Sequence, residues 1–292
     1  MSGPVCLFAH HDPDGRIAPH VVHLLRGIRE SGFAIHVALS GQDHVRRSDA
    51  EAVRDTVAAI HPRPNAGLDF GAWRDLFARG CADGASEVLL ANDSVYGPLF
   101  PLPPIVAAMR ARNADAWGMV ESEQNGWHLQ SWFVCLSARA LAAVPVRRVL
   151  EQDFAGMSKR EVVLHGELGL GAAMEAAQLR VAARWRQPNR RLRRMVPGNA
   201  MHLDYMAVVR SGRVPFLKVE LLRDNPTAVH WVGRWRELVP PGSAFDPAWI
   251  DAHLSAGRPH RPPRPPRGFA ARLLQALISE DRPVALRTLR RH

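Results

Sequence analysis

Few cysteines and no long apolar segment set the first limits on this sequence. Its 292 residues include three cysteines, Cys6, Cys81 and Cys135. An odd number of widely separated cysteines does not suit a disulfide framework, is typical of a reduced cytoplasm, and lacks the spacing of a metal site. No signal peptide precedes the apolar segment Val5–Phe8, and no apolar run reaches the roughly 18 residues that a transmembrane helix needs. We therefore expect a cytoplasmic protein without a membrane span.

Lysine is almost absent, whereas arginine is abundant. Lys159 and Lys218 are the only lysines, yet the formal net charge is +10. Such a charge suggests anionic partners, but a chain rich in arginine, alanine and proline is also expected from a GC-rich genome. The sequence has no aromatic RNA-binding motif, zinc-ligand spacing or recognition-helix signature. We therefore expect no nucleic-acid partner.

Apolar residues are plentiful and alternate between strand and helix patterns. Hydrophobic residues make up 47 % of the chain, which is enough for a packed core. The predicted elements are a strand at Val5–His10, a helix at Ala18–Ser31, a strand at Phe33–Leu39, a helix at Ser48–Ile60, a strand at Glu87–Ala91, a helix at Pro103–Arg112, strands at Ala116–Val120 and Ser131–Leu136, a helix at Glu167–Gln178 and a strand at Arg180–Arg184. This alternation predicts an α/β fold with a mostly parallel central sheet and helices on both faces.

The end of the chain has a different composition. His260–Arg267, with the sequence HRPPRPPR, cannot form the interior of a helix or sheet. Gly268–Ile278 then has the spacing of a short amphipathic helix. We therefore predict one domain over residues 1–257 and a basic, Pro/Arg-rich tail over residues 258–292.

Polar clusters directly follow two of the predicted strands. The residues His10 to Asp12 end the first strand, and Asn92 to Ser94 follow the strand at Glu87–Ala91. In sheets of this kind, ligands bind beyond the carboxyl ends of the strands. The two clusters therefore predict one ligand site at that edge of the sheet.

Six segments of the chain resemble a known family. They are FAHHDPDGRI (Phe8–Ile17), PNAGLDFGAWRD (Pro64–Asp75), LLANDSVYGPLFPL (Leu89–Leu102), HLQSWFVCLSARAL (His128–Leu141), SKREVVLHGELGLGAAM (Ser158–Met174) and PFLKVELLRDNP (Pro215–Pro226). By these segments the chain resembles the rhamnan-synthesis F family of polysaccharide glycosyltransferases. The order of an Asn-x-Gly segment at Asn65, an acidic strand end at Asp93 and a later carboxylate at Glu167 is similar to inverting transferases with the GT-A fold. The resemblance implies a GT-A-like domain over residues 1–257.

The resemblance also implies an activity and its partners. It implies an inverting glycosyltransferase that moves a sugar from a nucleoside-diphosphate donor, with dTDP-rhamnose as the candidate, to a lipid-linked surface polysaccharide. The acidic motif of such enzymes usually has two aspartates around one residue, whereas Asn92-Asp93-Ser94 has one. Two alternatives therefore stay open, an enzyme with or without Mg²⁺ or Mn²⁺, and a catalytically degenerate domain that binds glycan or serves as a scaffold.

Donor binding is assigned to the loops at the predicted strand ends and at the start of a helix predicted at Ala72–Ala78. The candidate donor-binding residues are His11, Asp12, Asn65, Gly67, Asp69, Asn92 and Ser94. The free amides of a helix N-terminus favour anions such as a diphosphate. The structural alternatives are a polar turn at Asp12 and a helix cap at Asp69.

Two carboxylates are the candidate catalytic residues. The carboxylate oxygens of Asp93 are hard ligands of the kind that Mg²⁺ or Mn²⁺ prefers. His202 is a second candidate metal ligand. Asp93 can also hydrogen-bond the donor, or only form an Asx-turn. Glu167 is the candidate general base for the acceptor hydroxyl. Its alternatives are a first-turn residue stabilised by the helix dipole, and His165 as the base.

His128, Gln130 and Lys218 are the candidate contacts to the acceptor or the transferred sugar. His128 and Gln130 precede the strand predicted at Ser131. A buried structural histidine and a strand-edge pair of Lys218 with Glu220 are the alternatives. A lysine in so arginine-rich a chain indicates a position that needs a compact ammonium group.

The tail predicts a further partner. Basic residues attract anionic lipid and an apolar helix face inserts at a bilayer surface. The basic residues of the tail include Arg272, Arg282 and Arg287, and its apolar residues include Phe269, Leu273, Leu274 and Leu277. We therefore expect peripheral binding to the inner membrane, with a solvated tail or a helix docked on the domain as the alternatives.

Overall fold

The structure is a computed structural model of the chain, and it describes residues 3–188, 198–256 and 268–289. Its strands are β1 (Val5–His11), β2 (Ala34–Ser40), β3 (Ala59–Arg63), β4 (Glu87–Asn92), β5 (Val95–Tyr96), β6 (Ala116–Ser122), β7 (His128–Leu129), β8 (Phe133–Ser137), β9 (Val181–Trp185) and β10 (Leu217–Lys218). Its helices are α1 (Pro19–Glu30), α2 (Arg47–Val53), α3 (Leu68–Ala78), α4 (Pro103–Arg110), α5 (Ala138–Ala142), α6 (Val144–Glu151), α7 (Lys159–Val162), the π-helix η1 (Val163–Leu168), α8 (Gly169–Ala176), α10 (Ala200–Leu203), α11 (Tyr205–Arg210), α12 (Val219–Arg223), the 3₁₀-helix η2 (Val232–Leu238), α13 (Ala248–Ala256), α14 (Phe269–Ile278) and α15 (Arg282–Leu289).

One central sheet organises the first two thirds of the chain. Its strand order is β3-β2-β1-β4-β8-β6-β7, and β9 also pairs with β6. Strands β3, β2, β1 and β4 are parallel, whereas β8 is antiparallel to both of its neighbours. Strand β6 and its parallel partner β9 therefore run in the direction of β4 again. The predicted α/β fold class with a mostly parallel sheet is confirmed, and its GT-A-like character stays a prediction.

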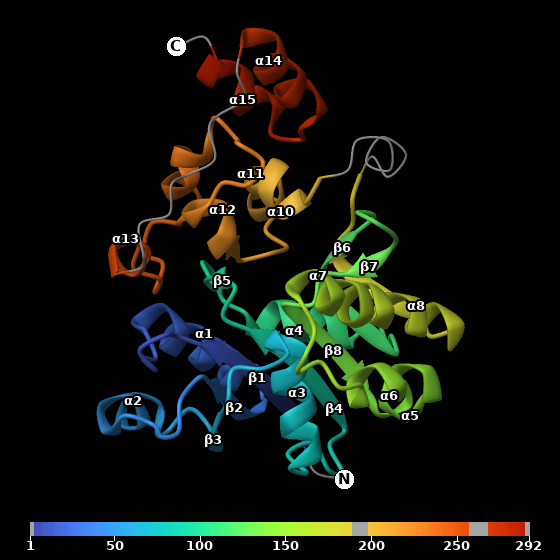
Figure 1. The fold of residues 1–292 in the computed structure, drawn as a ribbon. Coiled ribbons are helices and arrows are strands. Elements are labelled where there is room, and N and C mark those ends of the chain that lie inside the picture. Colours follow the sequence, from blue (N-terminus) through green and yellow to red (C-terminus); the bar gives the residue numbers. More distant parts are fainter. Residues whose placement is uncertain (1–2, 189–197, 257–267, 290–292) are drawn as a thin grey trace.

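Helices cover both faces of this sheet (Figure 1). Successive side chains of a strand point to opposite faces, so an unbroken apolar strand must be buried on both sides. In β1, Cys6 and Phe8 pack in the core shared with α1 and α4. Val5 and Leu7 belong to the core on the other face, which α3, α6 and α8 complete. The apolar run in β1 is thus the direct cause of the two-sided packing.

The second predicted helix is wrong in its second half. It was expected over Ser48–Ile60, but α2 ends at Val53 and the chain then forms β3. The helix also begins one residue earlier than predicted, because its N-cap residue is Arg46, which makes no side-chain capping hydrogen bond. Residues 59–63 pair in parallel with β2, so backbone pairing at the sheet edge outweighs the local helical pattern.

A helical layer lies at the carboxyl end of the sheet (Figure 1). Helices α10 to α15 form a third apolar core, which also takes in Tyr96 of β5 and Leu99. Strand β10 pairs with β5 and so ties this layer to the segment that follows β4. The layer covers the edge at which the predicted ligand site lies. Among the described helices, none has the length and apolarity that crossing a bilayer requires.

The last two helices pack on this layer. The Asp281 carboxylate, which is buried, accepts hydrogen bonds from the backbone nitrogens of Met206 and Ala207 at 3.0 and 2.5 Å and from Trp231 Nε1 at 3.1 Å. Residues 268–289 are therefore docked on the protein. This arrangement is one of the two structural alternatives given for the tail. The predicted Pro/Arg segment His260–Arg267 lies outside the described residues, and the domain boundary at residue 257 stays a prediction.

Candidate functional site

Asp93 lies just beyond the carboxyl end of β4, beside the end of β1. Its Oδ2 accepts hydrogen bonds from His10 Nδ1 at 2.5 Å and from the backbone nitrogen of His11 at 2.9 Å. The other ring nitrogen of His10 donates to the carbonyl oxygen of Arg16 at 2.9 Å. Both ring nitrogens face acceptors, so this geometry fits the protonated ring. His10 was predicted to lie in this polar cluster without a role, because only the fold shows that its side chain meets Asp93.

The ionisation of this pair is set by two opposing effects. Burial acts against both charges, but the hydrogen bond and charge of Asp93 outweigh it and raise the pKa of His10. In the same way, burial alone would raise the pKa of Asp93, but its contacts to His10 and His11 lower it. Both shifts favour the imidazolium–carboxylate form of this pair, in which His10 is buried and Asp93 is partly buried.

A hydrogen-bonded chain joins four of the predicted site residues. Asp69 Oδ2 accepts from Asn92 Nδ2 at 2.6 Å, and Asn92 Oδ1 accepts from the Ser94 hydroxyl at 2.7 Å. The Ser94 hydroxyl oxygen in turn accepts from Lys218 Nζ at 3.2 Å. The structure thus brings together three predicted donor-binding residues and one predicted sugar contact. Their roles stay predictions.

Charge is concentrated around this chain. Burial, and then the negative charge of Asp93, raise the pKa of Asp69 to about 6, although Lys218 opposes the shift. Burial also lowers the pKa of Lys218, and the charges of Glu167 and Asp69 counteract that effect. The charged groups of Asp69, Asp93, Glu167 and Lys218 therefore influence one another's protonation across one polar region.

The start of α3 shows why Gly67 and Asp69 occupy their positions. Gly67 is the N-cap residue, with φ +71°, and a Cβ there would lie 2.7 Å from Phe154 Cβ. Only glycine fits this conformation and close approach without strain. Asp69 lies in the first turn, and its carboxylate binds Asn92. The alternative that Asp69 caps the helix is therefore wrong.

The other predicted donor-binding residues lie on neighbouring loops. His11 Nδ1 is 3.1 Å from the Ser40 carbonyl oxygen, and a Cβ on Gly41 would contact both His11 and Asn65. Asp12 Oδ1 accepts from the backbone nitrogens of Asp14 and Arg16, at 2.8 and 3.1 Å. Asp12 therefore forms the turn that was its structural alternative, and donor contact by His11, Asp12 and Asn65 stays a prediction.

Glu167 has a different local structure from the one predicted. It was expected to begin a helix, but it lies in the π-helix η1, between α7 and α8. The explanation of Glu167 as a first-turn residue stabilised by a helix dipole is therefore wrong. Next to it, a Cβ on Gly166 would lie 2.7 Å from the ring of Phe70, so glycine lets η1 pack closely against α3. Single π-helical turns are rare and are frequent at functional sites.

The carboxylate of Glu167 is held by two residues. Oε2 accepts from the backbone nitrogen and the hydroxyl of Ser131, at 2.7 and 2.5 Å, and Oε1 lies 3.3 Å from His128 Nε2. His128 Nδ1 donates to the carbonyl oxygen of Gly126 at 2.9 Å. Burial alone would raise the pKa of Glu167, but His128 and Ser131 lower it to about 2. Burial likewise opposes the charge on His128, but its bond to Glu167 raises its pKa.

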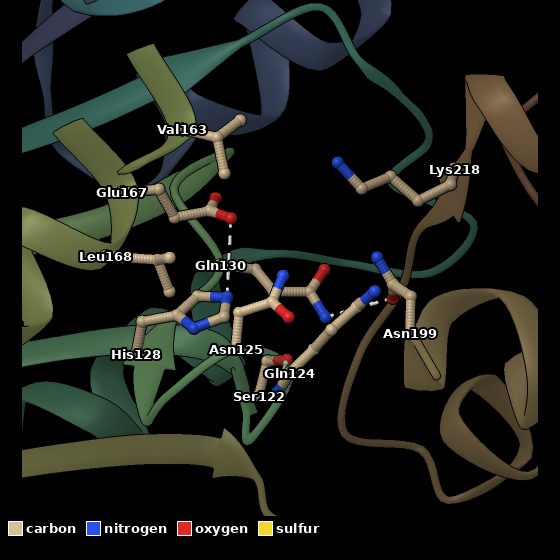
Figure 2. Close-up of a pocket in the computed structure, with 10 residues that line it drawn as sticks. All are labelled: Ser122, Gln124, Asn125, His128, Gln130, Val163, Glu167, Leu168, Asn199 and Lys218. Carbon is tan, nitrogen blue, oxygen red and sulfur yellow. Dashed lines mark hydrogen bonds and ion pairs between the residues drawn. The ribbon is translucent and has the colours of Figure 1, made fainter. Parts of the chain in front are cut away.

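A cavity of about 160 Å³ opens beside Glu167 (Figure 2). An apolar cavity of about 150 Å³ accommodates benzene, so this space suits one six-membered ring rather than a whole nucleotide sugar. Its lining residues are Ser122, Gln124, Asn125, His128, Gln130, Val163, Glu167, Leu168, Asn199 and Lys218. Figure 2 shows Glu167 and Lys218 on opposite sides of it. Gln130 Nε2 donates to Asn199 Oδ1 at 3.1 Å and completes the wall between them.

Several lining residues were missed in the sequence. Ser122 is the last residue of β6, and Gln124 and Asn125 belong to the turn that follows. The segment Ala116–Val120 was predicted as a strand without a role. The signal available was the polar character of Ser122, Gln124 and Asn125 at a strand end. Asn199 reaches the cavity from the helical layer, and no local pattern marks such a contact. His165, the alternative base, is exposed.

The residues around Asp93 do not form a ready cation site. His202 is buried, with Nε2 3.7 Å from Glu220 Oε2, and burial and the charge of Lys218 lower its pKa to about 3. Among the described residues, one group of three His, Cys, Asp or Glu side chains lies close enough to share an ion. That group contains neither Asp93 nor His202. The need for Mg²⁺ or Mn²⁺ therefore stays a prediction.

Comparisons with known proteins point to one family. The family model described as rhamnan synthesis protein F matches residues 37–230, a stretch that includes Asp69, Asp93 and Glu167. No curated protein matches the chain. Among solved structures, the crystal structure of HddC from Yersinia pseudotuberculosis is 12 % identical, with 55 % of this chain and 86 % of that chain covered and a TM-score of 0.32.

Proposed function

The chain belongs to the rhamnan synthesis protein F family, and from this premise we propose that it is a glycosyltransferase of polysaccharide synthesis. Family membership connects the chain with polysaccharide synthesis, and the transfer reaction is the proposed part. The observation that carries the proposal is the cavity of about 160 Å³ with the Glu167 carboxylate on one side and the Lys218 ammonium on the other. A space for one sugar ring between a base and a cation is what transfer from a nucleoside-diphosphate sugar requires.

We assign the donor to the carboxyl edge of the sheet and its sugar ring to the cavity. The nucleoside lies toward His11 and Asn65, and the diphosphate lies toward the N-terminus of α3 and Lys218. Free amides at a helix start and a lysine ammonium both favour negative charge. The charge of Lys218 then stabilises the diphosphate as it leaves, in a site whose burial strengthens electrostatic contacts. A dTDP-linked rhamnose is the donor to test first.

The reaction follows from this placement. An acceptor hydroxyl oxygen attacks the anomeric carbon and forms the new glycosidic bond, while the bond from that carbon to the diphosphate oxygen breaks and its electrons leave with the diphosphate. The hydroxyl proton passes to Glu167 Oε1, because Oε2 accepts two hydrogen bonds from Ser131 whereas Oε1 has a single, longer contact of 3.3 Å to His128 Nε2. Attack on the face opposite the leaving group inverts the anomeric carbon. The acceptor is proposed to be a lipid-linked glycan.

The strength of Glu167 as a base depends on His128. Burial favours its neutral form, but with His128 protonated the pKa of Glu167 is held at about 2, which makes a weak base. Loss of the His128 proton removes the largest influence that lowers this pKa. The pair therefore titrates jointly, and the basic form of the site is the one in which His128 is neutral.

The same low pKa favours a second candidate function. A carboxylate fixed by Ser131 and His128 also suits a degenerate domain that binds glycan without transferring sugar. The two candidates differ in one experiment, a binding screen of nucleoside-diphosphate sugars with and without Mn²⁺, followed by measurement of donor hydrolysis. Binding with hydrolysis supports the transferase. Binding of glycan alone, without any donor bound, supports the degenerate domain and contradicts the transferase.

We also propose that α14 contacts the inner membrane surface. Phe269, Leu274 and Leu277 on this helix are 61, 62 and 45 % exposed, although the helix is docked on the protein by its other face. Arg282 and Arg287 are exposed nearby in sequence. Apolar side chains beside arginines favour an anionic bilayer surface. Such contact would bring the cytoplasmic enzyme to a lipid-linked acceptor.

A further inference from the structure

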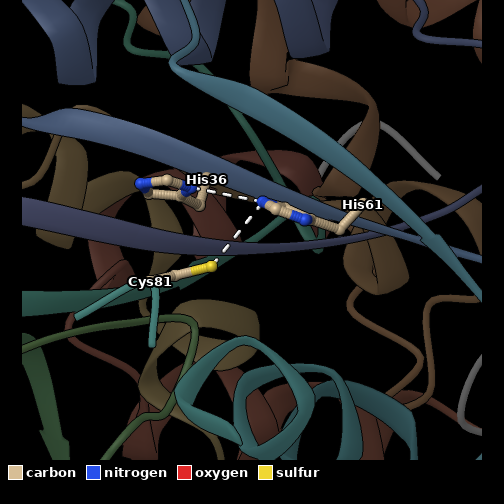
Figure 3. A group of neighbouring side chains, drawn as sticks. All are labelled: His36, His61 and Cys81. Atoms are coloured by element: carbon tan, nitrogen blue, oxygen red, sulfur yellow. Dashed lines mark hydrogen bonds between the residues drawn. The ribbon is translucent and has the colours of Figure 1, made fainter. Parts of the chain in front are cut away.

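We propose that His36, His61 and Cys81 form a site for a zinc ion or a similar borderline-soft divalent cation at the edge of the central sheet. The three side chains meet on one face of the sheet (Figure 3), and none of them lines the cavity beside Glu167. Two imidazoles and one thiol are the ligand types that such an ion prefers. The ion would hold the edge strand β3, its neighbour β2 and the end of α3 together.

The strand register explains why the two histidines meet. In the parallel pair of β2 and β3, His36 is opposite Ala59 and His61 is opposite Ala38. Residues two apart in a strand share a face, so His36 and His61 are diagonal neighbours on the same side of the sheet. That side is the one covered by α3, since Ala38 belongs to the core that α3 completes. Cys81 follows the end of α3 and faces both rings.

Two of the three distances between ligand atoms fit a tetrahedral ion, and the third, from His36 to Cys81, is at most 4.8 Å. With bonds of about 2.0–2.1 Å to nitrogen and about 2.3 Å to sulfur, tetrahedral ligands lie about 3.3 Å apart for two nitrogens and about 3.6 Å apart for nitrogen and sulfur. His36 Nδ1 and His61 Nε2 are 3.2 Å apart, and Cys81 Sγ is 3.6 Å from His61 Nε2. One ligand atom from each of the three residues lies within 4.8 Å of the other two. The fourth position is left for water.

The surroundings also suit a cation. Burial lowers the pKa of both histidines and so favours the neutral rings that bind a metal ion, whereas burial raises the pKa of the Cys81 thiol. The charged groups around the cluster are of both signs, since Arg79, Asp75 and Asp83 all act on His61 or Cys81. All three ligand residues are partly accessible, which gives an ion an entry path. Pinning β3 would protect the exposed edge of the sheet, where strands are prone to pair with other chains.

Cobalt is the probe that tests this site most directly. Chelator-treated full-length protein without an affinity tag is titrated with Co²⁺, and the thiolate-to-cobalt charge-transfer absorption is recorded. We expect saturation at one equivalent, displacement by Zn²⁺, and a thermal unfolding midpoint that rises with Zn²⁺. In Cys81→Ser the absorption should vanish and the affinity should fall at least tenfold. Cys6 and Cys135 stay in place and, being buried in the core, contribute nothing to the signal.

A histidine pair provides the matched control. His61→Asn should lose at least tenfold in Co²⁺ affinity, whereas His44→Asn, at an exposed loop position outside the cluster, should bind like the unaltered protein. Circular dichroism establishes that each variant is folded, and His61→Asn tests the site if Cys81→Ser does not fold. Absence of saturable absorption in the unaltered protein, or equal absorption in Cys81→Ser, would overturn the proposal. Neither result bears on sugar transfer, because these residues lie outside the cavity.

Discussion

Replacing Asp93 by asparagine tests the buried ion pair that Asp93 forms with His10. Removing one partner of a buried pair costs about 3–5 kcal/mol of unfolding free energy. The side chain of Asp93 is 22 % exposed, and an asparagine can still hydrogen-bond His10. We therefore expect the smaller loss of about 2 kcal/mol, which leaves a domain of ordinary stability folded.

The loss should depend on pH in a defined direction. The pKa of Asp93 is lowered by folding, so its contribution is present above the unfolded value of about 3.9 and disappears as pH falls through the folded value. The pKa of His10 is raised, so its contribution is complete below about 6.5 and disappears as pH rises through the folded value. The difference between the two proteins should be largest between about pH 4 and 6.5 and smaller at pH 9.

Urea unfolding at pH 5.5, 7 and 9 measures this difference. Asp43→Asn, at an exposed loop position, is the matched control and should change stability by less than about 0.5 kcal/mol at each pH. A loss for Asp93→Asn that is the same at all three pH values would refute the ion pair. Transfer activity of the folded variant should fall as well, since Asp93 is one of the two candidate catalytic residues.

Three further predictions concern the helix start, the catalytic pair and the membrane contact. Gly67→Ala should lower the free energy of unfolding by about 2–4 kcal/mol, measured in urea, because a Cβ meets Phe154 and the backbone has positive φ. Turnover of the unaltered enzyme should rise as pH passes the raised pKa of His128, because Glu167 then becomes a stronger base, and His128→Gln should remove that limb of the pH profile. The double variant Phe269→Ser and Leu274→Ser should bind anionic vesicles at least about tenfold more weakly in sedimentation, because each apolar side chain adds about 1.5–3 kcal/mol when fully buried.

Each of these has a matched control or a contradicting result. Gly233→Ala should leave stability nearly unchanged, since among the described residues no atom lies within 4 Å of a Cβ built there. A pH profile that is identical in His128→Gln would contradict the coupling of that residue with Glu167. Val144→Ser, at an apolar position of α6 that is 49 % exposed, should bind vesicles like the unaltered protein. Equal binding by the α14 variant would contradict the membrane contact.

The sheet was largely predictable because its strands are buried apolar runs. Strands β1, β2 and β4 begin and end within one residue of their predicted positions. Strand β3 was not predictable, because its sequence continues the helical pattern of α2 and contains a proline. What makes it a strand is pairing with β2, which is not written in the local sequence.

The candidate site was predictable in its composition but not in its connections. Strand ends marked His10 to Asp12 and Asn92 to Ser94 as polar clusters at one edge, and the structure places them side by side there. The environment of Glu167 depends on a π-helix and on Ser131, which is 36 residues away in the chain. Neither the rare helix type nor a contact over that separation has a periodic signal.

Turnover of a nucleoside-diphosphate sugar by Glu167→Gln tests the central claim most directly. The variant and the unaltered protein are compared for donor affinity and for sugar transfer or donor hydrolysis at one pH, after urea unfolding has established that both are folded. We predict that turnover falls about 10²–10⁴-fold while donor affinity changes little, because a general base acts in the transition state. Unchanged turnover in Glu167→Gln, or an equal loss of affinity and turnover, would contradict the assignment of Glu167 as the base of a glycosyltransferase.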